Sequence, residues 1–384
     1  MNKKITIVGC GISAATLANV LANKGWDVTI YEKQSFIGGN CYDSKNQDGI
    51  LIHNFGPHIF HTSYEDVFQF ISKFTKLNGY VNKVLVNVDN KLFPLPINFK
   101  SIEIIMCDKA KDVITTLKET FKDKKTITLF DLKQVKHPAI EQFVDYISKN
   151  VYFNYSAKMW GKKFEDIDPA TINRVKIILG YEHNYFPEDK YQGLPTDGYT
   201  SMIQKMLDHP NIHIKMNTNA LDHIKFDNVI TLDGQTLDCP LIYCGPLDEA
   251  ANYKFGTLPY RSLNIKFETL KQDKYQDTAV INYPADPKMT RIAEYKQMTL
   301  QFVKGVTTIS KEYPGQFDLK SNDFNVRHYP IINQESQDLY NKYCAEFKKY
   351  PNFYPLGRLS QYKYFDMDDA IKQALDLAKR LENE

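Results

Sequence analysis

The chain has 384 residues, of which 43% are hydrophobic and 24% are charged, so we expect a sizeable core and two or three domains. The net charge of +2, with acidic and basic residues interspersed, argues against a nucleic-acid groove or a membrane-binding surface. Six cysteines without a CxxC pair predict free thiols, no metal site and a cytoplasmic location, and no apolar run reaches the roughly 18 residues of a membrane span.

Residues 4–33 have the pattern of a strand, a glycine turn, a helix and a second strand. Gly9 and Gly11 allow a tight turn, and the free N–H groups of the following helix would hold a pyrophosphate. Ala14 replaces the third glycine of the GxGxxG pattern, which is a mild departure because alanine is the next smallest residue. Glu32 ends the second strand where an acid accepts hydrogen bonds from a ribose. A tight turn without a ligand is the alternative.

A second glycine pair follows the second strand. Gly38, Gly39 and Asn40 predict a further backbone loop, which favours FAD over NAD as the dinucleotide. The string "FGPHIFHTS" then places His58 and His61 three residues apart. Because further ligands are absent nearby, we expect these histidines to line a flavin face and not to hold a metal.

The rest of the chain alternates between helical and strand periods. Residues 80–98 read as a hairpin, 100–180 as helices, 186–198 as a loop that could move, and 211–335 mainly as strands, including 298–304. We predict a mixed α/β and α+β fold, with a Rossmann-like two-glycine FAD domain made of residues 1–79, 199–258 and 336–384. A helical domain of residues 99–198, with a mobile lid at about 165–195, and an antiparallel sheet domain of residues 80–98 and 259–335 would be inserted into it.

Arginines are scarce, six among 48 basic residues, and four of them lie in aromatic, polar strings: Arg174, Arg261, Arg291 and Arg358. The guanidinium group pairs bidentately with phosphate, and tyrosine hydroxyls donate to phosphate oxygens. This combination favours a substrate that carries its own diphosphate beside the flavin. Arg380 and Arg327 are more simply interpreted as surface or structural ion pairs.

Near the C-terminus, Asp366, Met367 and Asp368 lie at the expected start of the last helix. The backbone N–H groups of that helix would face the pyrimidine edge of the flavin, where negative charge gathers on reduction. Simple helix capping is the alternative for the side chains of Asp366 and Asp368.

Motifs along nearly the whole chain occur in the order of one family: "GCGIS", "IGGNCYD", "GPHIFHT", "FPLPIN", "KMWG", "YCGPLD" and "DMD". The chain resembles the UDP-galactopyranose mutases, a family of flavoenzymes. The resemblance implies interconversion of UDP-galactopyranose and UDP-galactofuranose for a surface polysaccharide, through attack of N5 of reduced FAD on the anomeric carbon without net oxidation. It also implies NAD(P)H or another reductant for priming and a homodimer, while the charge pattern and the short apolar runs predict no nucleic acid and no membrane insertion.

The resemblance also assigns site residues, by position in the matching motifs. The implied substrate-binding residues are Tyr152, Tyr155, Trp160, Arg174, Tyr185, Asn282, Arg291, Tyr329 and Tyr364. The implied catalytic residues are Arg174, Arg291, His61, Arg261, Glu312 and Asp366. For the cofactor, the glycine motifs and the resemblance together indicate Gly9, Gly11, Ile12, Ser13, Glu32, Lys33, Gly39, Asn40, His58, Arg358, Asp366 and Met367.

Four residues depart from the family pattern in the base pocket and the lid: Val151, Met159, Lys176 and His328. They leave open the same chemistry on UDP-N-acetylgalactosamine or dTDP-fucose, although His61 favours galactose by family pattern. An amine-oxidase-like flavin oxidoreductase and a non-catalytic flavin-binding module are further alternatives, because a fold alone underdetermines function.

Overall fold

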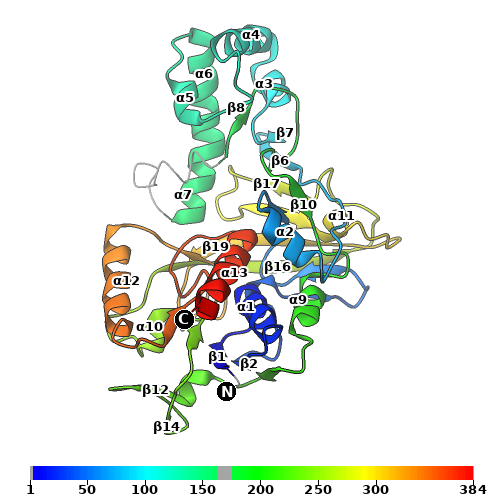
Figure 1. Ribbon diagram of the computed structural model, residues 1–384. Helices are drawn as coiled ribbons and strands as arrows, with labels where there is room; N and C mark the ends of the chain where they lie inside the picture. The colour runs from blue at the N-terminus through cyan, green and yellow to red at the C-terminus, as the bar shows by residue number, and fades with distance from the viewer. Residues whose placement is uncertain (1–2, 162–174, 384) are drawn as a thin grey trace.

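The structure is a computed structural model that describes residues 3–161 and 175–383 (Figure 1). A parallel sheet lies near both termini, in the order β11-β2-β1-β15-β21. Its strands are β1 (Lys4–Val8), β2 (Asp27–Tyr31), β11 (Ile212–Lys215), β15 (Leu241–Tyr243) and β21 (Phe353–Pro355). The strands come from three distant parts of the chain, and the Rossmann-like fold class is confirmed.

Helices cover this sheet and explain why its inner strands are so apolar. Ile5, Ile7, Val28 and Ile30 share one face of the sheet, because they alternate along β1 and β2, and they are almost completely buried there. Against them pack α1 (Ile12–Ala22), α9 (Tyr199–Leu207) and α13 (Met367–Asn383). The alanines of α1 are also fully buried, and their small side chains let the helix approach the strands closely.

A second sheet of seven strands lies above the first in Figure 1, in the order β20-β16-β19-β18-β17-β6-β7. Its strands are β6 (Val84–Val88), β7 (Lys91–Leu95), β16 (Tyr260–Leu270), β17 (Val280–Asn282), β18 (Arg291–Glu294), β19 (Thr307–Gln316) and β20 (Tyr329–Pro330). All neighbours are antiparallel except β6 and β17, which run parallel. These two strands belong to separate passages of the chain, so no tight turn fixes their relative direction.

The strand predicted at residues 298–304 is wrong. The structure has α11 (Tyr295–Thr299), followed by an irregular segment up to β19. Tyr295 and Met298 are buried three residues apart, which is a helical spacing, and Phe302 is 95% exposed. Leu300, in the left-handed conformation with φ 54°, ends the helix.

A helical lobe forms the top of the molecule in Figure 1. It contains α3 (Phe99–Met106), α4 (Ala110–Thr120), α5 (Leu129–Lys133), α6 (Pro138–Ile147), a π-helical turn (Ser148–Phe153) and α7 (Asn154–Trp160). Local signals start these helices: Asn98 and Ser101 form a capping box for α3, and Pro138 occupies the first turn of α6. The lobe shares its apolar core with β6 and β7.

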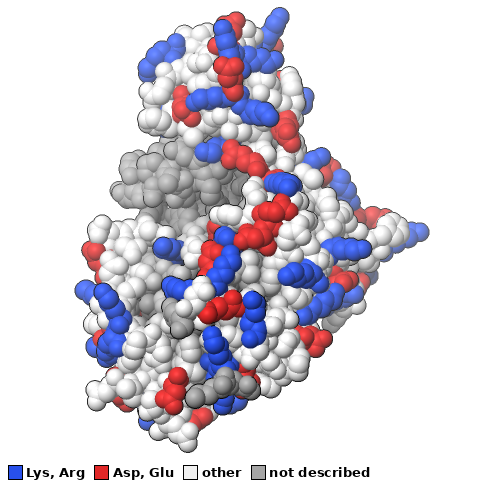
Figure 2. Space-filling view, viewed as in Figure 1, with Lys and Arg blue, Asp and Glu red and all other residues white. Residues whose placement is uncertain are grey.

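The remaining elements are short, apart from one helix. They are β3 (Asp43–Lys45), β4 (Leu51–His53), β5 (Phe60–Thr62), α2 (Glu65–Ile71), β8 (Thr126–Ile127), β9 (Ile177–Ile178), β10 (Tyr191–Gly193), β12 (Ile224–Phe226), β13 (Ile230–Leu232), β14 (Gln235–Thr236), α10 (Leu247–Ala250) and the longer α12 (Gln334–Phe347). Figure 2 shows lysine and arginine interspersed with acidic residues over the visible face. Within residues 3–161 and 175–383, no helix is both long enough and apolar enough to cross a membrane.

Candidate active site

A cavity of about 960 Å³ lies where the two sheets and the helical lobe meet. Gly9 and Gly11 line it from the carboxyl end of β1, Tyr155 from α7, and Asn282 and Arg291 from the seven-stranded sheet. The carboxyl ends of parallel strands are the usual place for a dinucleotide in such folds. The cavity therefore reaches from a dinucleotide position to a second wall that could hold a substrate.

The two glycine turns predicted from the sequence lie against each other. Gly9 has φ 93° and Gly11 precedes α1, whose first turn no side chain of the described residues caps. The N–H of Gly38 donates to the carbonyl of Cys10 at 2.8 Å, and a Cβ on Gly39 would lie 3.4 Å from the Cα of Gly11. The result is an open helix N-terminus between two close backbone turns, which suits a pyrophosphate.

Glu32 lines the same end of the cavity and is 6% exposed. Its Oε2 accepts from the N–H of Cys10 at 2.7 Å and its Oε1 from the N–H of Gln34 at 2.8 Å. Burial raises the pKa of Glu32, although these amide donors and Lys33 oppose the shift. Each carboxylate oxygen keeps a lone pair for a ribose hydroxyl, and the bond from Cys10 to Oε2 also fixes the first glycine turn.

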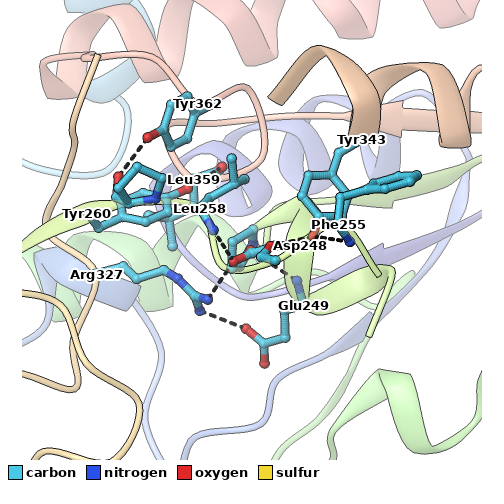
Figure 3. A network of polar contacts seen from close by, with 12 residues as sticks. Asp248, Glu249, Phe255, Leu258, Tyr260, Arg327, Tyr343, Leu359 and Tyr362 are labelled. Atoms are coloured by element: carbon cyan, nitrogen blue, oxygen red, sulfur yellow. Dashed lines mark hydrogen bonds and ion pairs between the residues drawn. The ribbon is translucent and has the colours of Figure 1, made fainter. Parts of the chain in front are cut away.

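Arg327 connects the dinucleotide end to the second sheet (Figure 3). Its guanidinium donates to Asp248 at 3.1 Å and to Glu249 at 3.2 Å, and its carbonyl accepts from the side chain of Asn40 at 3.1 Å. The predicted ion pair is thus confirmed. Arg327 also lines the cavity, a position that the sequence did not predict for it. Lys33 lines the cavity as well, and its ammonium is 2.7 Å from the carboxylate of Glu249.

The last helix begins at Met367, as expected, beside the first turn of α1. Gly357 has φ 85°, and a Cβ there would lie 3.1 Å from Oγ of Ser13, so this loop and α1 almost touch. Arg358 lies over the ring of Tyr329 at 5.5 Å. Asp366 accepts a hydrogen bond from the hydroxyl of Tyr364 at 3.1 Å. Phenol, guanidinium and carboxylate groups thus gather where the cofactor and substrate ends of the cavity join.

The substrate end contains a buried ion pair. Nε of Arg291 is 2.7 Å from Oε2 of Glu312, and the two side chains are 21% and 1% exposed. Arg291 lines the cavity, whereas Glu312 lies behind it. Among the described residues, Oε1 of Glu312 has no hydrogen-bond partner. The carboxylate therefore holds one edge of the guanidinium and leaves other N–H groups to face a ligand.

Most of the predicted site residues line the cavity. Every predicted cofactor residue lines the cavity, as do the substrate residues Tyr152, Tyr155, Trp160, Tyr185, Asn282, Arg291, Tyr329 and Tyr364, and also His61 and Asp366. Arg174 lies outside the described residues. Arg261 is not on the cavity wall, because its guanidinium donates to the carbonyls of Met159 and Lys158. Of the departures, Val151, Met159 and Lys176 line the cavity, and His328 is buried outside it.

His53 and His58 lie side by side, with ring centroids 6.2 Å apart, and His58 lines the cavity. Burial lowers the pKa of His53 to about 4 and that of His58 well below its usual value, so both rings are neutral at pH 7. Nδ1 of His53 accepts from the N–H of His58 at 3.0 Å. Nδ1 of His58 has no partner among the described residues, and this buried polar atom fits a site that a ligand completes.

His61 is different because it forms an ion pair. Its Nδ1 is 2.7 Å from Oδ2 of Asp189, and its ring stacks on Phe186 with the centroids 3.6 Å apart. Burial lowers the pKa of His61, but the hydrogen bond to Asp189 and the charges of Asp366 and Asp189 outweigh burial and raise it overall. The sequence analysis missed Asp189, which β5 and β10 bring to His61 by pairing.

We expect Asp189→Asn to lower the pKa of His61 below its usual value, because burial would then act without its main opposing interaction. The ion pair stabilises the fold fully below the pKa of unfolded histidine, and this contribution is lost as pH rises through the raised folded pKa. NMR titration of the histidine ring protons, assigned with His61→Asn, measures the shift. Asp197→Asn, on the other side of β10, is the control that should leave His61 unchanged, because among the described residues Asp197 pairs with exposed Lys205.

Comparisons with known proteins agree with one another. A family model described as UDP-galactopyranose mutase matches residues 150–364, and a model described as NAD(P)-binding Rossmann-like domain matches residues 7–74. A UDP-galactopyranose mutase of Mycoplasma genitalium is 40% identical over 98% of this chain and 94% of its own length. A dTDP-fucopyranose mutase of Escherichia coli is 30% identical over 98% and 97%. The crystal structure of a reduced UDP-galactopyranose mutase shares the fold, with a TM-score of 0.68 at 15% identity, covering 100% of this chain and 96% of that one.

Proposed function

The chain belongs to the UDP-galactopyranose mutase family, and we infer from this membership that it is an FAD-dependent isomerase that interconverts UDP-galactopyranose and UDP-galactofuranose. The observation that carries this conclusion is the 40% identity, over 98% of the chain, to a relative of that name. The cavity is consistent with it, because one continuous space joins a dinucleotide cradle to a wall with an arginine and several tyrosines.

The residues present fit FAD. The open N-terminus of α1, the glycine turns at Gly9 and Gly39 and the carboxylate of Glu32 would hold the pyrophosphate and the ribose. His58 and Arg358 lie farther along the cavity, where the flavin ring would be held. Bound FAD, once reduced, supplies a nucleophilic nitrogen for the anomeric carbon, without net oxidation of the sugar.

We propose that Arg291 grips the substrate diphosphate and that Glu312 orients it from behind. The hydroxyl of Tyr155 would donate to the same substrate, because burial raises its pKa and keeps it protonated. Tyr185, Tyr329 and Tyr364 would add further donors from the cavity wall. Trp160 lies 6.5 Å from the ring of Tyr329 and would close one end of the nucleotide position. The roles of Arg174 and Arg261 are predictions from the family resemblance.

Several finer assignments are proposals of the same kind. We propose the three-part division of the chain predicted from the sequence, and the presence of two sheets and a helical lobe supports it in outline (Figure 1). Six free cysteines support a reducing compartment such as the cytoplasm. Priming by NAD(P)H, a homodimer and supply of furanose sugar to a surface polysaccharide are proposed from the family resemblance alone.

The function is tested by incubating the purified protein with UDP-galactofuranose or UDP-galactopyranose, with and without dithionite, and separating the nucleotide sugars by chromatography. We expect interconversion only after reduction, with no steady consumption of oxygen or NAD(P)H. Continuous consumption of oxygen with substrate would instead indicate an oxidase. Parallel incubations with UDP-N-acetylgalactosamine and dTDP-fucose test the other sugars, and turnover of these alone would overturn the assignment to galactose.

A further inference from the structure

Lys158, near the end of α7, reaches out of the helical lobe to the loop between β17 and β18. Its ammonium donates to the carbonyls of Tyr283 at 2.8 Å, Pro284 at 3.3 Å and Met289 at 2.5 Å. A fourth, very short contact goes to the carbonyl of Asp286. An ammonium has three N–H donors, so the four carbonyl oxygens share them and at least one N–H lies between two oxygens.

The loop that supplies these carbonyls holds its own shape. The carboxylate of Asp286 accepts from the N–H groups of Lys288 at 2.8 Å and Met289 at 2.6 Å. Pro284 and Pro287 restrict its backbone further. The loop therefore keeps its conformation through contacts of its own, and its carbonyls converge on the position of the lysine ammonium.

Arg261, on β16, attaches the same end of α7 to the sheet. Its Nε donates to the carbonyl of Met159 at 2.6 Å and its Nη2 to that of Lys158 at 3.1 Å. These carbonyls belong to the last turn of the helix, where acceptors lack partners and a positive charge is favourable. Gly161 ends the helix with φ 62°, and a Cβ there would lie 2.7 Å from Nη1 of Arg261. The close fit indicates that α7 is held at a fixed position.

The two parts joined by Lys158 both contribute to the wall of the cavity. Tyr155, Met159 and Trp160 line it from α7. Asn282 lines it just before the loop and Arg291 just after it. Any shift of α7 relative to this loop changes the distance between the aromatic wall and the guanidinium of Arg291.

We propose that Lys158 is a positioning residue that fixes α7 against the β17–β18 loop, with Arg261 as its second support, and thereby sets the fit of the nucleotide diphosphate between these two parts of the wall. The proposal rests on the proposed function, because it assumes that a nucleotide binds there. On this view Arg261 acts on the substrate through α7, in place of the direct catalytic role that the family resemblance implies.

The test uses Lys158→Met in the full chain, in a Trp26→Phe background. The sequence has two tryptophans, so Trp160 becomes the single reporter of α7. We expect Trp160 to become more accessible to acrylamide, and the Kd for UDP and the KM for UDP-galactose to rise at least about tenfold, with a smaller change in kcat. FAD content and the melting temperature should change little, because the contacts of Asp286 within the loop maintain its conformation without the lysine.

Lys288→Met is the matched control, since it removes an exposed ammonium from the same loop. The proposal is overturned if Lys158→Met equals this control in both Trp160 quenching and the Kd for UDP. If the unsubstituted protein fails to bind UDP, the proposed function fails, while Trp160 quenching still decides whether Lys158 positions α7. If Lys158→Met does not fold, Lys158→Gln is measured in the same way, because glutamine keeps two N–H donors. The same outcome then overturns the proposal.

Discussion

Replacement of Arg291 by methionine is expected to lower kcat/KM for UDP-galactose by roughly 30- to 4,000-fold, the equivalent of about 2–5 kcal/mol for a buried, charge-assisted contact. The guanidinium is held by Glu312 at 2.7 Å and lines the cavity, so no rearrangement of the arginine is needed to grip a diphosphate. The same change leaves the carboxylate of Glu312, which is 1% exposed, without its cation. We therefore expect the free energy of unfolding to fall as well, by about 3–5 kcal/mol.

A second variant separates the two effects of losing Arg291. Arg291→Met combined with Glu312→Gln removes both charges, so the free energy of unfolding should recover most of its loss while kcat/KM stays low. Arg291→Lys keeps the charge but not the planar fork, and an intermediate kcat/KM is expected. Steady-state kinetics and urea unfolding measure the two quantities. If Arg291→Met alone leaves KM and kcat unchanged, Arg291 does not contact the substrate.

The dinucleotide half of the site was predictable because its signals are local. Gly9, Gly11 and Glu32 belong to one strand-helix-strand unit, and Gly39 follows it closely in the sequence. Gly9 and Gly39 have positive φ values that favour glycine, and Glu32 follows directly after the second strand. The resemblance to a family added residues of the substrate wall, such as Tyr155 and Tyr185, that no spacing rule connects. Both halves line one cavity because three distant segments of chain build the parallel sheet.

Contacts between distant residues and contacts to the backbone were not predictable from the sequence. Asp189 pairs with His61 across 128 residues, and the pairing follows from the register of β5 and β10. Lys158 binds backbone carbonyls, which leave no trace in residue types. The family resemblance implied a catalytic role for Arg261, but its guanidinium donates to carbonyls at the end of a helix, a position that suits a positive charge.

Gly9→Val is expected to yield protein that retains little FAD after purification. Gly9 has φ 93°, a region that a β-branched residue occupies only under strain, and its Cβ would lie 3.3 Å from Cβ of Cys244. Relief of either constraint moves the turn that presents the N–H groups of α1, because the N–H of Gly9 also bonds the carbonyl of Tyr31 at 2.8 Å. The ratio of flavin to protein absorbance measures the loss, and titration with FAD gives the change in Kd.

Gly25→Val is the matched control for this variant. Gly25 has a similar φ of 82°, but a Cβ there would meet nothing within 4 Å, and the residue does not line the cavity. Both variants carry the backbone strain, about 1–3 kcal/mol, so both should lose stability, yet only Gly9→Val should lose FAD. Equal flavin content in the two proteins would contradict a pyrophosphate site at this turn. A Gly9→Val protein that folds but retains no FAD would show that this turn is needed for cofactor binding and is not essential for folding.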